Sequence, residues 1–338
     1  MKKISIVILN WNGEEMLRAF LPSVLVCSSG RDVEVCVADN GSTDASCAML
    51  EEEFPIVRLI RLDENYGFAE GYNRALSQID AEYVILLNSD VEVTPDWLQP
   101  LTEFMDNHPE VAACQPKIMS YKKRDTFEYA GAAGGFIDKL GYPFCRGRIF
   151  DVVEKDEGQY DTPLPVFWAT GAALMIRLDV YKQVGGLDGR FFAHMEEIDL
   201  CWRLRSRGYG IYCIPQSEVY HVGGATLKKE NPRKTFLNFR NNLLMLYKNL
   251  PEKELKSVLF VRGLLDWVAA AVFLLKGDFG AAKAVSRARK QYKRLRPQFV
   301  ADRKENLKAS VTLQIPERYR FSILWKHKIC RKKYFSDL

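Results

Sequence analysis

Three short stretches of this sequence carry side chains that could act together in one reaction. An apolar run ends in Asn88-Ser89-Asp90, the pair Glu196-Glu197 lies far downstream, and His221 follows that pair. Carboxylate oxygens and imidazole nitrogens are ligands of divalent cations, and a positioned carboxylate can take the proton of a hydroxyl. These residues therefore supply what is needed to hold a metal-bound diphosphate and to deprotonate a hydroxyl.

The first half of the sequence contains the elements that must position them, because apolar runs alternate there with amphipathic stretches. The apolar runs are continuous, as in a parallel sheet that is covered on both faces. Such alternation predicts an α/β fold with a doubly wound, mostly parallel sheet. The expected strands are Ile4–Leu9, Val33–Ala38, Val57–Arg61, Tyr83–Leu87 and Val111–Cys114, and the expected helices are Glu14–Val26, Ala45–Glu53, Phe68–Gln78 and Pro95–Asn107.

Polar clusters follow three of these strands. They are Asn10-Trp11-Asn12-Gly13, the run from Asp39 to Asp44, and Asn88-Ser89-Asp90. Ligands of open α/β sheets bind outside the carboxyl ends of the strands. Any one cluster could be a turn or a helix cap, but the three together predict a nucleotide site.

The glycines of Asn65–Arg74 would permit close approach of a phosphate to the start of a helix, although helix packing explains them equally well. No Gly-Lys-Ser/Thr follows them, and the first strand is not followed by GxGxxG. These absences argue against a Walker-type phosphate loop and against a dinucleotide oxidoreductase.

In order and spacing, six segments resemble the inverting glycosyltransferases of family 2, and most of all the bacterial rhamnosyltransferase-type enzymes of surface polysaccharide synthesis. The resemblance covers roughly Lys2 to Leu250 and implies the GT-A fold. It also implies metal-dependent transfer of a sugar from a nucleotide sugar, dTDP-rhamnose or a UDP-sugar, to a glycan or lipid-linked glycan acceptor. The segments are Ile4–Gly13, Val37–Ser46, Asn65–Asn73, Asn88–Asp90, Phe191–Arg203 and His221–Thr226.

The resemblance implies a role for each matching residue. Asp90 takes the last position of a DxD-like motif and would bind Mn²⁺ or Mg²⁺, with His221 as a further ligand. Glu197 takes the place of the catalytic carboxylate. Three departures are Asn88 at the first DxD position, Glu197 in place of a shorter aspartate, and Met195 in place of an aromatic residue. The expected nucleotide-sugar contacts are Asn10, Trp11, Asn12, Asp39 (to the pyrimidine base), Asn40, Gly67, Asn73, Asn88 and Ser89.

On the acceptor side we expect Trp168, Gly171, Glu196 and Asp199. Each polar or aromatic candidate also has a structural alternative. Trp168 fits a core equally well, Glu196 would favourably meet a helix dipole, and Asp199 can pair with Arg203 one turn later. His221 fits a hydrogen-bonded structural role as well as a metal site.

The expected organisation is a GT-A domain over residues 1–230, with a nucleotide-sugar half to about 115 and an acceptor half from about 116. A helical, basic region follows over residues 231–338. We expect Ser120–Pro165 to form glycine-rich loops and short strands over the acceptor side. A strand is expected at Ala172–Ile176, and helices at Leu178–Val184 and Ile198–Arg207.

The net charge of +5 is unevenly distributed. From Lys276 onward 18 Lys and Arg oppose 5 Asp and Glu, a net +13, whereas the rest carries 30 against 38, a net −8. Leu255–Leu275 is apolar but interrupted by Arg262 and Asp266, which predicts an amphipathic helix and not a spanning one. With the basic stretch Lys283–Arg296, it predicts peripheral attachment to the cytoplasmic face of the inner membrane. A helical bundle or a dimer contact is the alternative.

The remaining features bear on the cellular compartment, on possible partners and on rival functions. Eight scattered cysteines without a CxxC pair indicate a reduced, cytoplasmic protein, and the absence of a nucleic-acid module argues against a nucleic-acid partner. A nucleotidyltransferase would need a basic, glycine-rich loop after the first strand. The non-enzymatic rival is a degenerate family member that binds glycan or scaffolds a membrane assembly.

Overall fold

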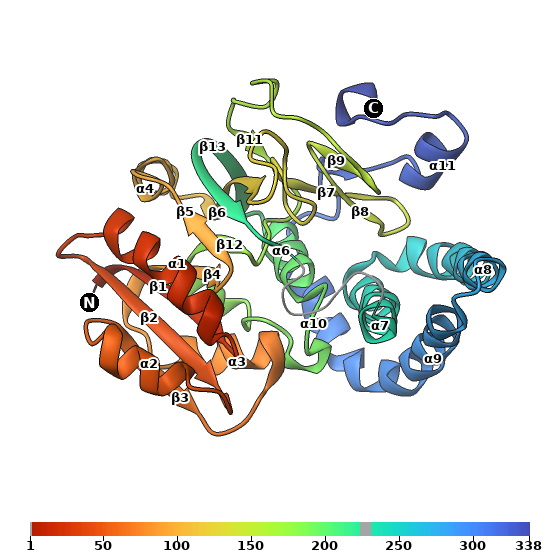
Figure 1. Cartoon of the computed structure of the whole chain (residues 1–338). Coiled ribbons are helices and arrows are strands. Elements are labelled where there is room, and N and C mark those ends of the chain that lie inside the picture. The colour runs from red at the N-terminus through yellow and green to blue at the C-terminus, as the bar shows by residue number, and fades with distance from the viewer. Residues whose placement is uncertain (1, 224–230) are drawn as a thin grey trace.

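A nine-stranded mixed sheet lies at the centre of the computed structural model, which describes residues 2–223 and 231–338 (Figure 1). Its strands are β1 (Lys2–Asn10), β2 (Val33–Asn40), β3 (Arg58–Leu62), β4 (Ala81–Asn88), β5 (Val91–Val93), β6 (Val111–Ser120), β11 (Leu164–Pro165), β12 (Ala173–Arg177) and β13 (Gly210–His221). The order is β11-β13-β6-β12-β4-β1-β2-β3, and β5 pairs with β13. The pairs β1–β2, β1–β4, β2–β3 and β6–β13 are parallel, which confirms the predicted mostly parallel sheet.

Helices cover both faces of this sheet because successive strand residues point in opposite directions. Ile6 and Ile8 of β1 join one hydrophobic cluster with Leu17, whereas Val7 joins the other with Tyr72. The first cluster includes residues of α1, α2 and α4, and the second includes residues of α3, α5 and α6. These helices are α1 (Glu14–Cys27), α2 (Ser46–Glu53), α3 (Gly67–Leu76), α4 (Leu98–Asn107), α5 (Leu178–Gln183) and α6 (Glu196–Ser206).

One strand takes a place that local pattern did not predict. The strand expected at Ala172–Ile176 forms as β12, but it runs antiparallel between β4 and β6. The strand expected to end at Cys114 continues to Ser120, because its second half pairs with Glu218–His221 of β13. The place of β12 and the full length of β6 are therefore decided by strands that are distant in sequence.

The segment expected to form loops and short strands builds part of a second, five-stranded sheet with the order β10-β9-β8-β7-β14. Close packing explains one of its glycines, since a Cβ on Gly135 would lie 2.1 Å from the Trp168 ring. The strands are β7 (Gly135–Asp138), β8 (Pro143–Cys145), β9 (Arg148–Ile149), β10 (Val152–Val153) and β14 (Arg318–Tyr319).

The C-terminal region is helical, as predicted, but it is joined closely to the rest of the molecule. Figure 1 shows α7, α8 and α9 beside one another, and α7 also contacts α6. The chain then returns to the second sheet, where β14 pairs with β7. The α-helices are α7 (Pro232–Asn249), α8 (Glu252–Leu275), α9 (Phe279–Leu295), α10 (Val300–Ala309) and α11 (Ile323–Lys328); the short 3-10 turns are η1 (Gly189–Phe191), η2 (Arg296–Phe299) and η3 (Phe335–Asp337).

Candidate active site

The ends of β1 and β2 hold the predicted base-binding carboxylate in a fixed orientation. Their register places Asn10 beside Asp39. The Asn10 amide donates to Asp39 Oδ1 (3.1 Å), and the Ser42 amide donates to Asp39 Oδ2 (3.0 Å). Asn10 Oδ1 is buried and has no hydrogen-bond partner among the described residues. This arrangement gives Asp39 a defined direction in which to accept a further hydrogen bond.

Two neighbours complete this part of the rim. Asn12 has a φ of 50° and its side-chain oxygen accepts from the backbone amide of Thr43 (2.7 Å), so it ties the first rim loop to the second. Trp11 is 49% exposed, so its ring is available as a stacking surface. Asp44 accepts from the Ser46 amide (3.1 Å) at the start of α2, although the N-cap residue of that helix is Ala45 and has no side-chain cap.

The predicted contacts Asn40 and Asn73 have their amides taken up by the protein. Asn40 donates to the carbonyl oxygen of Gly67 (3.0 Å) and accepts from the amide of Tyr66 (3.0 Å), and it is buried. Asn73 donates to the carbonyl oxygen of Leu187 (2.7 Å), and its oxygen accepts from that residue's amide. Asn40 therefore positions the Gly67 turn, and Asn73 has a structural role in place of a direct donor contact.

Asn73 lines a polar cavity of about 580 Å³ with Glu70, Asp188, Arg190 and Lys248. None of the other predicted donor residues lines this cavity. It therefore lies apart from the rim formed by Asp39 and Asp90.

Gly67 connects the donor rim to the segment that precedes α6. Its φ is 75°, and a Cβ there would lie 2.7 Å from the carbonyl oxygen of Phe192. That oxygen accepts a hydrogen bond from the Phe68 amide at the start of α3 (2.7 Å). Only glycine allows this approach, so the predicted glycine matters as the contact between the donor loop and the catalytic segment.

The two predicted metal ligands lie side by side. The β13–β5 register pairs His221 with Val91, which places the imidazole next to Asp90. His221 Nε2 lies 3.1 Å from Asp90 Oδ1 and 3.4 Å from the Asn88 amide nitrogen. At the same strand end, a Cβ on Gly13 would meet Asn10 Oδ1 at 2.5 Å and Ser89 Oγ at 3.7 Å, so the ends of β1 and β4 converge.

Glu128 is a residue of this cluster that the sequence analysis missed. Its Oε2 lies 3.6 Å from His221 Nδ1, and both side chains are buried. Burial lowers the pKa of His221, but the carboxylates of Asp90 and Glu128 outweigh burial and raise that pKa to about 10. Glu128 reaches His221 only in the tertiary structure, so no local sequence pattern could have identified it.

This cluster fits a divalent cation as one edge of its coordination shell. Among the described residues, no set of three or more His, Cys, Asp or Glu side chains is arranged to hold a metal. Asp90 and His221 nevertheless offer one oxygen and one nitrogen from adjacent positions, and Glu128 can orient the imidazole from behind. Residues 224–226 of the matching motif lie outside the described residues.

The predicted catalytic glutamate stands at the start of α6 after a strained backbone segment. Phe192, His194 and Met195 have φ values of 67°, 70° and 73°. Burial raises the pKa of Glu197 to about 7, and burial with the charge of Glu197 raises the pKa of Glu196. Glu197 Oε2 is enclosed and has no hydrogen-bond partner among the described residues. Such a carboxylate is suited to taking a proton near neutral pH.

An asparagine from α7 holds this strained segment, and it too was missed. Asn241 Nδ2 lies 2.9 Å from the Phe191 carbonyl oxygen and 2.8 Å from those of Ala193 and His194. Asn241 is fully buried. Backbone in the left-handed region persists only where its surroundings impose it, and Asn241 supplies that constraint.

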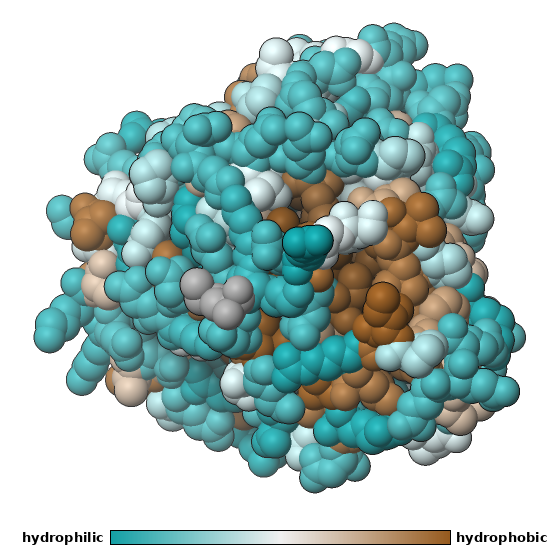
Figure 2. Space-filling model, turned by 90° about the vertical axis from the view of Figure 1, so that its left-hand side faces the viewer, coloured by the Kyte–Doolittle hydropathy of each residue, from teal (hydrophilic) through white to brown (hydrophobic). Residues whose placement is uncertain are grey.

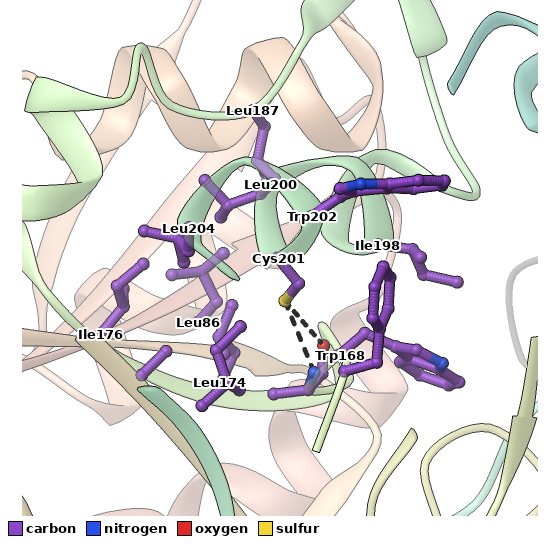
Figure 3. Close-up of a cluster of buried hydrophobic side chains, with 14 of the residues drawn as sticks. Leu86, Trp168, Leu174, Ile176, Leu187, Ile198, Leu200, Cys201, Trp202 and Leu204 are labelled. Atoms are coloured by element: carbon purple, nitrogen blue, oxygen red, sulfur yellow. Dashed lines mark hydrogen bonds between the residues drawn. The ribbon is translucent and has the colours of Figure 1, made fainter. Parts of the chain in front are cut away.

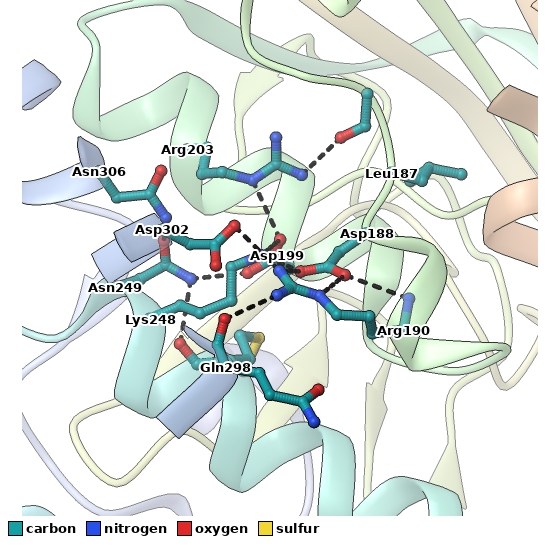
Figure 4. A network of polar contacts seen from close by, with 12 residues as sticks. Leu187, Asp188, Arg190, Asp199, Arg203, Lys248, Asn249, Gln298, Asp302 and Asn306 are labelled. Atoms are coloured by element: carbon teal, nitrogen blue, oxygen red, sulfur yellow. Dashed lines mark hydrogen bonds and ion pairs between the residues drawn. The ribbon is translucent and has the colours of Figure 1, made fainter. Parts of the chain in front are cut away.

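Asp199 does not face an acceptor, which corrects the sequence-based assignment. It is fully buried and accepts from Arg203 Nε (3.0 Å), Lys248 Nζ (2.8 Å) and Asn249 Nδ2 (2.8 Å). Figure 4 shows this network between α6, α7 and the Asp188 turn. The alternative pairing with Arg203 is confirmed, and the network fixes α6 against α7.

Trp168 likewise belongs to the core. It is 4% exposed and its Nε1 donates to the carbonyl oxygen of Phe136 (2.9 Å). Figure 3 shows it in the cluster between α6 and the sheet, where Cys201 contacts Ala169. Gly171 packs against the Phe68 ring, since a Cβ there would lie 2.9 Å from it. Glu196 is 4% exposed, so all four residues predicted for the acceptor side are buried, whereas the predicted base Glu197 retains partial exposure.

Solved structures with this fold are glycosyltransferases. The structure of Staphylococcus aureus TarS 1–349 in complex with UDP-GlcNAc superimposes with a TM-score of 0.58 at 16% identity, covering 91% of this chain and 89% of that one. The mannosyltransferase PcManGT from Pyrobaculum calidifontis, in complex with GDP-Man and Mn²⁺, gives 0.53 at 14% identity, covering 90% and 87%. These likenesses confirm the GT-A fold.

Sequence relatives agree with the fold. An N-acetylglucosaminyl-diphospho-decaprenol L-rhamnosyltransferase of Mycobacterium tuberculosis (strain CDC 1551 / Oshkosh) is 30% identical over 236 residues, 64% of this chain and 75% of that protein. The O-antigen biosynthesis protein RfbC of Myxococcus xanthus is 28% identical over 238 residues, 68% of this chain and 18% of that protein. A family described as "Glycosyl transferase family 2" matches residues 5–185, the part that carries the Asp39 and Asp90 rim. The chain therefore belongs to glycosyl transferase family 2 and is a glycosyltransferase.

Proposed function

We propose that this enzyme transfers a hexosyl residue, with inversion, from dTDP-rhamnose or a UDP-sugar to a glycan or lipid-linked glycan in cell-surface polysaccharide synthesis. The observation that carries the proposal is the Glu197 carboxylate, whose pKa is raised to about 7 and whose Oε2 has no hydrogen-bond partner among the described residues, on the segment whose Phe192 meets Gly67 of the donor loop. The names of the rhamnosyltransferase and O-antigen relatives support the choice of sugar and product.

The proposed reaction is a single displacement. The acceptor oxygen attacks the anomeric carbon, its proton passes to Glu197, and the bond from that carbon to the diphosphate oxygen breaks. Asp39 would accept a hydrogen bond from the pyrimidine base, and Trp11 would stack on it. Enclosure of Glu197 keeps its pKa high enough to receive the proton.

Asp90 and His221 would hold a divalent cation, Mn²⁺ or Mg²⁺. The bound ion would neutralise charge on the departing diphosphate as a Lewis acid. A carboxylate oxygen suits either ion, and the imidazole nitrogen moves the preference toward Mn²⁺. The PcManGT structure contains Mn²⁺, which supports a divalent metal here.

We place the enzyme as a peripheral protein at the cytoplasmic face of the membrane, with its basic C-terminal region toward the lipid. The free state of all eight cysteines supports a reducing compartment. A catalytically degenerate glycan-binding or scaffold protein is the second candidate. The orientation of Asp39 by Asn10 and Ser42, and the enclosed Glu197, favour the enzyme.

A thermal-shift titration tests the donor site first. The full chain is melted with UDP, dTDP, GDP and CDP, each with and without Mn²⁺, because a ligand of the native state raises the melting temperature. We expect a Mn²⁺-dependent shift with a pyrimidine diphosphate and a smaller one in Asp39→Ala. A shift without sugar transfer to any of a broad set of acceptors would favour the scaffold, and no shift in any condition would refute the donor site.

A further inference from the structure

Helix α8 is oriented with its charged residues toward the protein. Arg262 and Asp266 are 2% and 0% exposed. The Arg262 guanidinium donates to the carbonyl oxygen of Leu140 (3.0 Å) and lies 4.0 Å from the Tyr142 ring centroid. Asp266 accepts from Arg289 of α9 (2.5 Å). The polar edge recognised in the sequence is therefore the face by which α8 is attached to the rest of the molecule.

This attachment leaves the apolar side of α8 uncovered. Phe260, Leu264, Trp267 and Leu275 are 69%, 56%, 57% and 88% exposed. Their spacing of i, i+4, i+7 and i+15 places them on one side of a helix. With Val268, Val272 and the 70%-exposed Phe279 at the start of α9, they form what we call the α8 outer face.

The extent of the α8 outer face exceeds ordinary surface hydrophobicity. By length and composition α8 is apolar enough to cross a membrane, yet only 22% of its apolar 18-residue window is buried. Figure 2 views the molecule from the left-hand side of Figure 1, whereas α8 lies at the right of that figure, and it shows a surface that is largely hydrophilic apart from one hydrophobic area. Contiguous exposed apolar surface of this kind marks a site of interaction.

An apolar groove extends the α8 outer face between α8 and α9. It has a volume of about 410 Å³ and is lined by Trp267, Ala270, Ala271, Leu274, Phe279, Ala282, Lys283 and Ser286. Its lining is almost wholly apolar, with one lysine. This composition suits a hydrocarbon chain that has an anionic head.

Lysines surround the α8 outer face. Lys253 and Lys256 are exposed at the start of α8, Lys276 follows its end, and Lys283 is exposed on α9. Lysine stems can lie along apolar surface while their ammonium groups reach anionic headgroups. Against a second copy of the chain, the same lysines would meet one another across a two-fold axis, which is unfavourable. Charge complementarity therefore selects an anionic bilayer as the partner.

We infer that the α8 outer face inserts into the headgroup–acyl boundary of an anionic bilayer, with α8 lying parallel to the membrane. The buried Arg262 and Asp266 keep α8 attached to the body, so it does not span. The inference deepens the proposed function, on which it rests, because it names the surface that brings the active site to a lipid-linked acceptor. It also adds, to the peripheral attachment expected from the amphipathic and basic pattern, the orientation of α8 and the apolar side chains that insert.

Co-sedimentation of the full chain with vesicles tests this inference. Phosphatidylcholine vesicles are compared with vesicles that also contain phosphatidylglycerol. Leu264→Glu/Leu275→Glu changes the α8 outer face, and Ile56→Glu is the matched control at an 83%-exposed apolar residue elsewhere. We expect wild type and the control to pellet with anionic vesicles, and the double variant to lose at least about tenfold in partitioning, as expected when two leucines no longer enter an apolar phase.

A second variant tests the charge. Lys253→Gln/Lys256→Gln/Lys276→Gln/Lys283→Gln should weaken binding to anionic vesicles and leave binding to neutral vesicles unchanged. Light scattering and carbonate extraction test the other occupants. A wild-type dimer that dissociates in the double variant, or wild type that resists carbonate, would overturn the inference in favour of a second copy or of a spanning helix. Unchanged sedimentation of the double variant would overturn it too.

The vesicle experiment can succeed or fail independently of the test of the proposed function. Vesicle binding requires no turnover, so failed sugar transfer with intact sedimentation would refute the function and leave the docking surface. Nucleotide-induced thermal shifts should be equal in wild type and in the double variant. Loss of transfer to a lipid-linked acceptor, with transfer to a water-soluble acceptor retained, is the expected activity of that variant.

Discussion

The side-chain amide nitrogen of Asn241 lies 2.8 Å from the carbonyl oxygen of His194, two residues before the first of the paired glutamates. The same nitrogen lies 2.8 Å from the carbonyl oxygen of Ala193. His194 and Met195 are both in the left-handed region, which costs about 1–3 kcal/mol for each non-glycine residue. Helix α7 therefore determines where α6 starts, and with it the position of Glu197.

We expect Asn241→Ala to reduce kcat by about 100-fold, because a catalytic group displaced by about 1 Å loses that much. The nucleotide-induced thermal shift should remain, since Asn241 contacts the segment before α6 and not the Asp39 rim. Asn238→Ala on the same helix is the control, because its amide donates to the Lys234 carbonyl oxygen within α7 (2.9 Å). An unchanged kcat in Asn241→Ala, or an equal loss in the control, would refute the positioning role.

Glu197→Gln should reduce transfer by roughly 10²- to 10⁴-fold, because the amide cannot accept the hydroxyl proton. Glu196→Gln is the matched comparison, since both glutamates lie in the first turn of α6 and each has an enclosed oxygen. We expect the greater loss in Glu197→Gln, with nucleotide binding retained in both. Turnover near the wild-type rate in Glu197→Gln would show that the base is another group.

The pH dependence should report the raised pKa of Glu197. As a base it must be deprotonated, so kcat should rise with pH through about 7 and this limb should vanish from the residual activity of Glu197→Gln. The stability effect has the opposite sign. The folded state binds more protons than the unfolded state between about 4.5 and 7, so unfolding free energy falls as pH rises across that interval. Urea titrations should show Glu197→Gln gaining on wild type over it, and a constant difference would contradict the shift.

Removing divalent metal should abolish transfer, and adding Mn²⁺ should restore it. Isothermal titration of Mn²⁺ in the presence of nucleotide should show strong losses in Asp90→Asn and His221→Ala. Glu128→Gln should lose about 10- to 100-fold in metal affinity, as for other carboxylates that orient a ligating histidine. His327→Gln in α11 is the control. Equal Mn²⁺ affinity in Glu128→Gln and wild type would show that Glu128 does not orient His221.

Asp199→Ala should destabilise the fold by about 3–5 kcal/mol, because it leaves buried cations without their carboxylate. Lys248 retains Asp188 at 2.7 Å, so the loss should fall on the α6–α7 contact and not on the whole network. Urea unfolding measures this loss of stability. The control is Asp125→Ala, which removes the exposed ion pair between Asp125 and Lys155. A loss no larger than that of the control would contradict the network's role.

The sequence by itself determined where the first parallel strands lie and which polar residues follow them. Continuous apolar runs predicted the parallel strands β1, β2, β3 and β4 to within a few residues, because a strand covered on both faces needs apolar side chains at every position. Topology then brought Asn10 beside Asp39, as expected for parallel strands whose carboxyl ends share one edge. The paired Asp90 and His221 were also anticipated by type and order.

Only the tertiary structure decided what each side chain faces. Glu128, Asn241 and the orientation of Arg262 depend on segments that lie far apart in the chain, and no local period encodes such pairings. Asp199 has the residue type of a site residue, yet a lysine 49 positions later takes it into the interior. The same holds for α8, whose amphipathic pattern specifies a polar side and an apolar side. The contact of Arg262 with Leu140 and that of Asp266 with Arg289 turn the polar side inward. The apolar side of α8 therefore faces outward.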